Sequence, residues 1–251
     1  LRLRQPGDGE DARRIVLDIA RQHDAKLIVK SKSMVSEEIH LNHALEEAGI
    51  RVVETDLGEY IIQLAGDTPS HLIAPAIHVT REQVAELLSK RAGEELPAEV
   101  EPLVRIARKL LREDFVNADI GISGANIAIA ESGTLVIVSN EGNGRLVTTL
   151  QPVHIAILGV EKIVETLDDA TDILKVLPRS GTGQKITSYV SFITGPSRTA
   201  DIELTLATGV HGPGEVHIIL LDNGRWAARE DPDLREALQC IRCGACSNVC
   251  P

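Results

Sequence analysis

The chain has 251 residues, of which 43% are hydrophobic and 25% charged, and its formal net charge is −11. This balance excludes intrinsic disorder, and the length suffices for at least one sizeable hydrophobic core. No apolar stretch approaches the roughly 18 residues of a membrane span. The acidic balance argues against nucleic acid and anionic lipid as partners, because both are bound through clustered Lys and Arg.

Helical and strand patterns alternate along the first quarter of the chain. Apolar residues recur at helical spacing in some segments and form short continuous runs in others. The expected order is helix 11–23, strand 26–29, helix 34–48, strand 52–53 and helix 57–64. This alternation predicts βαβ units, and hence an α/β fold with an open, mostly parallel sheet flanked by helices.

A second half is expected after a Gly- and Pro-containing connection. Thr80 and Gln83 form a capping box that begins another helix, and residues 91–102 connect to a helix that runs to about Phe115. Four apolar runs then predict strands at 127–130, 135–138, 155–158 and 216–221. The Glu-Ser-Gly turn between the first two of these runs predicts a hairpin.

The strongest chemical signal is a cysteine run at the end of the chain. All four cysteines lie in the last 12 residues, as Cys240, Cys243, Cys246 and Cys250, followed by Pro251. Iron–sulfur clusters take soft thiolate ligands, and this C-x2-C-x2-C-x3-C-P spacing is that of bacterial ferredoxins. The spacing predicts that the first three cysteines hold one [4Fe–4S] cluster and that Cys250 serves a second.

The alternatives for this run are a zinc site or reactive thiols. Zinc sites separate their cysteine pairs by about a dozen residues, whereas here the pairs nearly overlap. Clustered thiols also favour a reducing compartment. Because the chain begins at Leu1 and ends directly after the run, we interpret it as a piece of a longer protein. The ligand set of its clusters is then incomplete, and this piece is expected to hold iron weakly.

Two loops are candidate anion sites. In open α/β sheets, anions bind where a strand leads into a helix N-terminus. The loop after the apolar residues 190–193 offers Ser197, Arg198, Thr199 and Asp201. The alternative is a structural turn in which Asp201 pairs with Arg198.

The second loop follows the strand expected at 26–29. Lys30 and Lys32 alternate with Ser31 and Ser33 there, which suits an anionic ligand. The alternative is that Ser33 only caps the helix that follows.

Several short segments, in this order, resemble the LUD-domain family of lactate-utilisation proteins. They are residues 30–34, 54–57, 67–71, 75–78, 124–126, 131–134, 139–143 and 194–203. Followed by the cysteine run, they resemble the iron–sulfur B branch of that family. The resemblance implies a LUD domain over residues 1–235, and the Gly- and Pro-containing connection described above predicts a sub-division of it near 91–115. It also implies the start of a ferredoxin-like 4Fe–4S module at 236–251.

The resemblance implies electron transfer during L-lactate oxidation to pyruvate, in the cytoplasm. It also implies two [4Fe–4S] clusters in the full-length protein. The expected partners are the other subunits of the lactate-utilisation system. Its fold would be similar to the sugar-phosphate isomerase and CoA-transferase type. CoA-transferases attack with a glutamate on a turn comparable to that of Glu131, so this residue is a catalytic candidate by analogy of fold. The alternative is a structural role, in which Glu131 is a buried carboxylate bonded to loop amides. The alternative functions are binding of an anionic small molecule with acyl-transfer or isomerase chemistry, and a docking scaffold for partner subunits.

Overall fold

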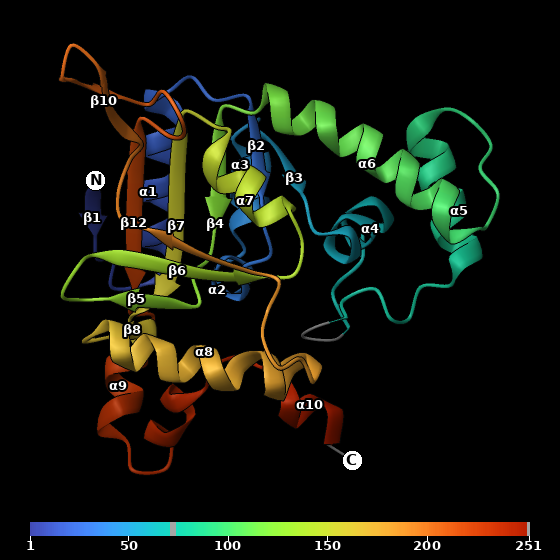
Figure 1. Ribbon diagram of the computed structural model, residues 1–251. Coiled ribbons are helices and arrows are strands. Elements are labelled where there is room, and N and C mark those ends of the chain that lie inside the picture. Colours follow the sequence, from blue (N-terminus) through green and yellow to red (C-terminus); the bar gives the residue numbers. More distant parts are fainter. Residues whose placement is uncertain (71–73, 250–251) are drawn as a thin grey trace.

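A parallel sheet forms the centre of the molecule. Figure 1 shows the computed structural model, which describes residues 1–70 and 74–249. Within these residues, six strands pair in the order β1-β12-β7-β4-β2-β3, every pair parallel. In that order they are β1 (Arg2–Arg4), β12 (Glu215–Leu221), β7 (Val153–Gly159), β4 (Ile120–Ser123), β2 (Leu27–Lys30) and β3 (Arg51–Glu54). The predicted open parallel sheet is therefore confirmed.

Three helices cover one face of this sheet. They are α1 (Gly9–Gln22), α2 (Met34–Glu38) and α3 (Leu41–Glu47). Residues on one side of α1, such as Val16 and Ile19, share a core with Ile28 of β2 and Ile155 of β7. Alternate residues of each strand point to opposite faces, which is why the continuous apolar runs of the sequence are buried on both sides.

The opposite face of the central sheet is covered partly by helices and partly by a second sheet. Beside β2 and β3 it is covered by α4 (Leu57–Ala65), α5 (Arg81–Ala92), α6 (Val100–Asn117) and α7 (Asn143–Thr149). The predicted capping box of Thr80 and Gln83 begins α5. α7 lies so close to β4 that a Cβ at Gly121 would come within 1.9 Å of the Val147 carbonyl oxygen, so only glycine fits there.

A second sheet covers the rest of that face. Its order is β8 (Ile163–Val164), β5 (Ile127–Ile129), β6 (Thr134–Ser139) and β9 (Tyr189–Ile193). β5 and β6 form the predicted antiparallel hairpin. Leu135 of this sheet packs against Ala156 and Ile218 of the central sheet, and the far side packs on α8 (Leu167–Thr182). Figure 1 shows α8 running below this second sheet.

The helix expected over residues 34–48 is interrupted. His40 has φ 50° and separates α2 from α3. The interruption coincides with tight packing on α1, because a Cβ at Gly9 would lie 2.9 Å from Ile39 Cγ2. Arg13 Nη1 donates a hydrogen bond to the Ile39 carbonyl oxygen at 2.8 Å, which satisfies that acceptor outside a helix.

The end of the chain folds beneath α8. It contains α9 (Arg225–Glu230), a 3-10 helix (Arg235–Gln239) and α10 (Ala245–Val249). Cys250, and with it the fourth thiol of the cysteine run, lies outside the described residues. Among the helices that the structure describes, none is long and apolar enough to cross a membrane.

Candidate functional site

The candidate site lies at the point in the central sheet where the order of strand addition reverses. β3 lies on one side of β2 and β4 on the other, so the loops that follow β2 and β4 diverge. Open α/β sheets bind ligands in the crevice at the carboxyl ends of their strands, at such a point. A cavity of about 360 Å³ lies there, lined by residues 31–35, 124–126, 137–141, 143–144 and 241–242, with Asp56, Ile157 and Lys162.

A second hollow of about 350 Å³ adjoins this cavity. The two share Lys32, Asp56 and Glu141 as lining residues. The polar crevice therefore extends from the loop after β2 across the loop after β3 toward the beginning of α4.

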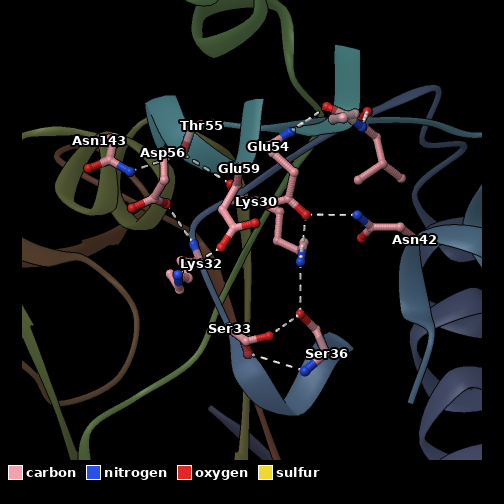
Figure 2. Close-up of polar contacts among 12 residues, drawn as sticks. Lys30, Lys32, Ser33, Ser36, Asn42, Glu54, Thr55, Asp56, Glu59 and Asn143 are labelled. Atoms are coloured by element: carbon pink, nitrogen blue, oxygen red, sulfur yellow. Dashed lines mark hydrogen bonds and ion pairs between the residues drawn. The ribbon is translucent and has the colours of Figure 1, made fainter. Parts of the chain in front are cut away.

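Lys30 is turned into the protein and does not line the cavity. It is 1% exposed, and its Nζ lies 2.7 Å from Oε1 of Glu54, its cross-strand neighbour in β3. Nζ also donates a hydrogen bond to Ser36 Oγ at 2.9 Å, and Asn42 donates to the same Glu54 oxygen at 2.7 Å. Figure 2 shows this buried network, which neutralises within the fold the charge that we expected to face an anion.

Lys32, two residues further on, does line the cavity. Its Nζ lies 2.9 Å from Glu59 Oε1, and its backbone N–H donates to Asp56 Oδ2 at 2.7 Å. Asn143 donates to Thr55 Oγ1 at 3.3 Å, which ties the start of α7 to the loop after β3. In Figure 2 these residues lie together on one side of the buried Lys30 network.

Asp56 is a site residue that sequence reasoning did not single out. Burial raises the pKa of its carboxyl group to about 6. The carboxylates of Glu141 and Glu54 act in the same direction, whereas the hydrogen bond from the Lys32 amide opposes the shift. A strongly shifted carboxyl group in a crevice is a typical feature of functional sites. The signal was present in the sequence, since Asp56 follows a strand end as Lys32 does.

Ser33 fits the capping alternative. Its Oγ accepts a hydrogen bond from the Ser36 amide at 3.3 Å at the start of α2. Gly124 of the neighbouring loop lies against it, because a Cβ there would be 3.1 Å from Ser33 Oγ. The two loops are thus in contact at these residues before they diverge, and both residues line the cavity.

The loop of Arg198 does not lead into a helix, so that part of the prediction is wrong. Residues from Arg198 onward form β10 (Arg198–Ile202), which pairs with β11 (Thr205–Thr208) in a two-stranded antiparallel sheet. β-Branched and apolar residues in this stretch favour a strand over a helix. The candidates here are engaged locally: Ser197 Oγ accepts from the His211 amide at 3.1 Å, and Thr199 Oγ1 donates to Asp201 at 2.5 Å. They do not line the cavity.

Glu131 is exposed in the β5–β6 turn, not buried as we expected for a structural carboxylate. Its Oε1 accepts a hydrogen bond from the Leu167 amide at 3.0 Å, at the first residue of α8. The Glu131 carboxylate thus satisfies a free amide of a helix terminus, and it does not line the cavity.

The cysteine loop lies beside the cavity, which its residues Ile241 and Arg242 line. Cys240, Cys243 and Cys246 are free thiols, and the chain between them turns through positive φ at Arg242 (60°) and Gly244 (74°). The Cys243 carbonyl oxygen lies close to α8, at 3.1 Å from where a Cβ of Gly181 would stand. The loop is therefore packed on the folded domain.

Two contacts orient Cys240. The Arg242 amide N lies 3.4 Å from its Sγ as a hydrogen-bond donor, and Lys162 Nζ donates to its carbonyl oxygen at 2.6 Å. Amides directed at sulfur stabilise thiolates and tune iron–sulfur clusters. Cys240, Cys243 and Cys246 offer soft thiols on a turning loop, and one backbone amide is directed at a sulfur. These features fit an iron–sulfur cluster held by the three cysteines.

The same loop supplies residues to the cavity. Ile241 and Arg242 line it, together with Lys162, which follows β7. These residues come from positions far from Lys32 in the sequence, and no motif linked them to it.

Together, the parallel sheet and its polar crevice define an open α/β domain of the kind that holds small molecules at the carboxyl edge of its strands. The family model of the LUD domain matches residues 7–221. The chain belongs to the LUD-domain family, as the order of its sequence segments indicated.

Curated relatives match almost the whole chain. It is 46% identical over 242 residues to the "Uncharacterized electron transport protein YkgF" of Escherichia coli (strain K12), and 46% identical over 243 residues to "Lactate utilization protein B" of Geobacillus sp. (strain WCH70). Each match covers 96% of this chain and 49% of the relative. The chain thus spans about half the length of the curated relatives it matches.

A solved structure of a DUF162 family protein from Deinococcus radiodurans is a more distant match. It is 16% identical, covers 86% of this chain and 99% of that one, and has a TM-score of 0.35. The fold class follows from the strand pairing of the central sheet.

Proposed function

We propose that this chain is the LUD-domain part of an iron–sulfur electron-transfer component of lactate utilisation, acting in the oxidation of L-lactate to pyruvate. The observation that carries the proposal is the ferredoxin-type cysteine run, packed on the LUD domain through α8 and Lys162. The names of two relatives, an electron transport protein and a lactate utilization protein B, support it.

In this proposal the thiolates of Cys240, Cys243 and Cys246 hold one [4Fe–4S] cluster, and Cys250 serves a second. When bound, the clusters supply one-electron transfer. The chain's own residues hold the loop in place, since Lys162 binds the Cys240 carbonyl and the Arg242 amide is directed at its sulfur. The partners would be the other subunits of the lactate-utilisation system, in the cytoplasm, where reducing conditions keep thiols free to bind iron.

The first test measures the metal. The natural full-length protein is isolated without oxygen, and iron, acid-labile sulfide and low-temperature EPR spectra are recorded. We expect about eight irons per chain, four for each of two cubanes, and a signal from reduced clusters. Cys243→Ser should lose about half of the iron, whereas Ala237→Ser, an exposed position in the preceding 3-10 helix, should lose none. Zinc, or no metal, would overturn the iron–sulfur part of the proposal.

The second test measures lactate use. In the source organism, Cys243→Ser should abolish growth on L-lactate while growth on glucose continues. Ala237→Ser should grow on both. Normal growth of Cys243→Ser on L-lactate would contradict an electron-transfer role for this loop.

A further inference from the structure

Three side chains that can bind a metal meet at the amino edge of the central sheet, at the other end of the strands from the cavity. Glu215 and His217 are the first and third residues of β12, so their side chains point to the same face. That face packs on α1, since Ile219 of β12 shares a core with Val16 of α1. Figure 1 shows α1 behind β12. His23 directly follows the last residue of α1 and lies against Glu215.

The ligand atoms of these three side chains form a compact group. Oε2 of Glu215 lies 3.2 Å from Nε2 of His217 and 3.7 Å from Nε2 of His23. All three atoms lie within 4.8 Å of one another. In a tetrahedral zinc site with bonds of about 2.0–2.1 Å, two ligand atoms lie about 3.3 Å apart. Small side-chain rotations therefore suffice to place the three atoms around one ion.

The chemistry of the donors selects the metal. Two imidazole nitrogens and one carboxylate oxygen suit Zn²⁺, whereas Mg²⁺ and Ca²⁺ take mainly oxygen ligands. Donors of this kind also bind Zn²⁺ more tightly than Fe²⁺. Two histidines and a glutamate are a ligand set of known zinc sites, in which a water molecule takes the fourth position. The composition of the group thus points to zinc with one open position.

Burial distinguishes this group from a chance cluster of surface side chains. The side chain of His217 is 0% exposed, and its Nδ1 has no hydrogen-bond partner among the described residues. Burying a polar group without a partner costs free energy, and a bond from Nε2 to a metal ion would offset that cost. The side chains of His23 and Glu215 are 29% and 40% exposed. The site is therefore open to solvent on one side, where the ion and its water can enter.

The local electrostatics favour a cation, with one opposing charge. The carboxylate of Glu215 and the partial negative charge at the end of α1, which His23 caps, both attract a metal ion. Arg2 opposes them, because its Nη2 lies 3.9 Å from Oε2 of Glu215. The Arg2 side chain is 55% exposed, so it can turn into water when a metal ion binds.

We infer that His23, Glu215 and His217 bind one zinc ion, with water as its fourth ligand. The ion joins the end of α1 to the start of β12, two elements from opposite ends of the chain. Because the unfolded chain does not hold these residues together, zinc binding stabilises the fold. The site shares no residue with the cysteine run and does not rest on the proposed function.

The test is calorimetric titration of the full-length protein with ZnCl₂, after loosely bound metal has been removed with a chelator. We expect one zinc ion to bind per chain, and X-ray absorption at the zinc edge to show nitrogen and oxygen ligands only. Sulfur ligands would place the zinc at the cysteine thiols and overturn the inference. The absence of zinc binding would overturn it as well.

Variants locate the ion. His217→Gln should weaken zinc binding by more than about 100-fold, since loss of a ligand costs more than the roughly 10–100-fold of losing a group that only supports one. His23→Gln should have a similar effect at a partly exposed position, where the core is not disturbed. His43→Gln is the control, because His43 pairs with Glu47 on α3 but belongs to no group of three such ligands among the described residues. Unchanged affinity in His23→Gln would overturn the inference.

Two further measurements use the charge and the stability of the site. Arg2→Gln should tighten zinc binding, because the opposing charge is removed. Zinc should raise the Tm of the natural protein and leave that of His23→Gln unchanged. An equal rise in both proteins would contradict the site.

Iron, counted separately, keeps this inference apart from the proposed function. One zinc ion beside the iron supports the inference and leaves the electron-transfer proposal intact. A protein that holds its iron and binds no zinc would overturn the inference alone.

Discussion

Two pairs of charged residues lie at the ends of β2 and β3. Each pair consists of a lysine and an acidic residue, but one pair is buried and the other lies at the cavity. Lys30 and Glu54 are cross-strand neighbours with almost no exposed surface. Lys32 and Asp56 follow Lys30 and Glu54 by two residues each. They line the cavity, and the Lys32 backbone amide donates a hydrogen bond to the Asp56 carboxylate. The first pair is closed by two hydrogen bonds, one from Lys30 to Ser36 and one from Asn42 to Glu54, whereas the second pair faces the crevice. Two residues along the sequence are thus enough to change the role of such a pair. Lys30 and Glu54 form a structural ion pair, whereas Lys32 and Asp56 are candidate ligand-binding residues.

Removing one member of the buried pair should have the largest effect. Lys30→Met leaves Glu54 buried without its counter-charge, and one Glu54 oxygen, Oε2, already has no hydrogen-bond partner among the described residues. We expect unfolding free energy to fall by about 3–5 kcal/mol, measured by urea denaturation. Lys26→Met, at an exposed position just before β2, should change it little.

The double variant Lys30→Met/Glu54→Leu should recover much of that loss, because no uncompensated charge then remains in the interior. If Lys30→Met alone were as stable as the natural chain, the contrast between the two pairs would not hold.

Asp56→Asn should stabilise the protein at neutral pH. Its pKa is raised in the folded state from 3.8 to about 6, so the folded state binds the proton more tightly than the unfolded state. Stability from this group is full below pH 4 and is lost as the pH rises through 6. The difference corresponds to at most about 3 kcal/mol.

Denaturation of the natural chain and of Asp56→Asn at pH 5 and pH 7.5 checks this prediction. The gain in stability from Asn should be larger at pH 7.5. Asp233→Asn, an exposed aspartate, is the control and should show no such difference. A gain that grows toward low pH would contradict the burial of the Asp56 carboxyl group.

Lys32→Met should have the smallest effect of the three. Its side chain is 24% exposed, and water partly screens its interaction with Glu59. We expect a loss of about 1 kcal/mol by urea denaturation, below that of Lys30→Met. A loss equal to that of Lys30→Met would erase the distinction between the two lysines.

Much of the fold could be predicted from the sequence. The apolar runs of β2, β7 and β12 and the hairpin of β5 and β6 are local patterns, and such patterns predict strands from the sequence alone. The short strand β4 was not predicted. The break at His40 could not be predicted, because it depends on the packing of Ile39 against α1. The loop of Arg198 was misjudged for a different reason. A strand followed by a polar Gly-Pro segment predicts a loop before a helix in an α/β fold, whereas this segment enters a β-hairpin.

The candidate site was predictable only in part. Lys32 follows a strand end, so its place at the carboxyl edge follows from the fold class. Lys162 and Arg242 reach the same cavity from about 130 and 210 residues further along the chain, and only tertiary structure brings them there. Whether Lys30 would face inward or outward was set by the strand register with Glu54, which the sequence does not show.

Arg242 lies between Cys240 and Cys243. This position would couple two binding equilibria, that of a ligand in the cavity and that of metal at the thiols. Arg242, which lines the cavity, and Cys240, a proposed cluster ligand, are joined by two peptide bonds. By thermodynamic linkage, if loading the thiols changes the affinity of the cavity by some factor, filling the cavity changes the affinity of the thiols for metal by the same factor. If the thiols hold a cluster as proposed, its binding would then depend on the occupancy of the cavity without any long-range conformational change.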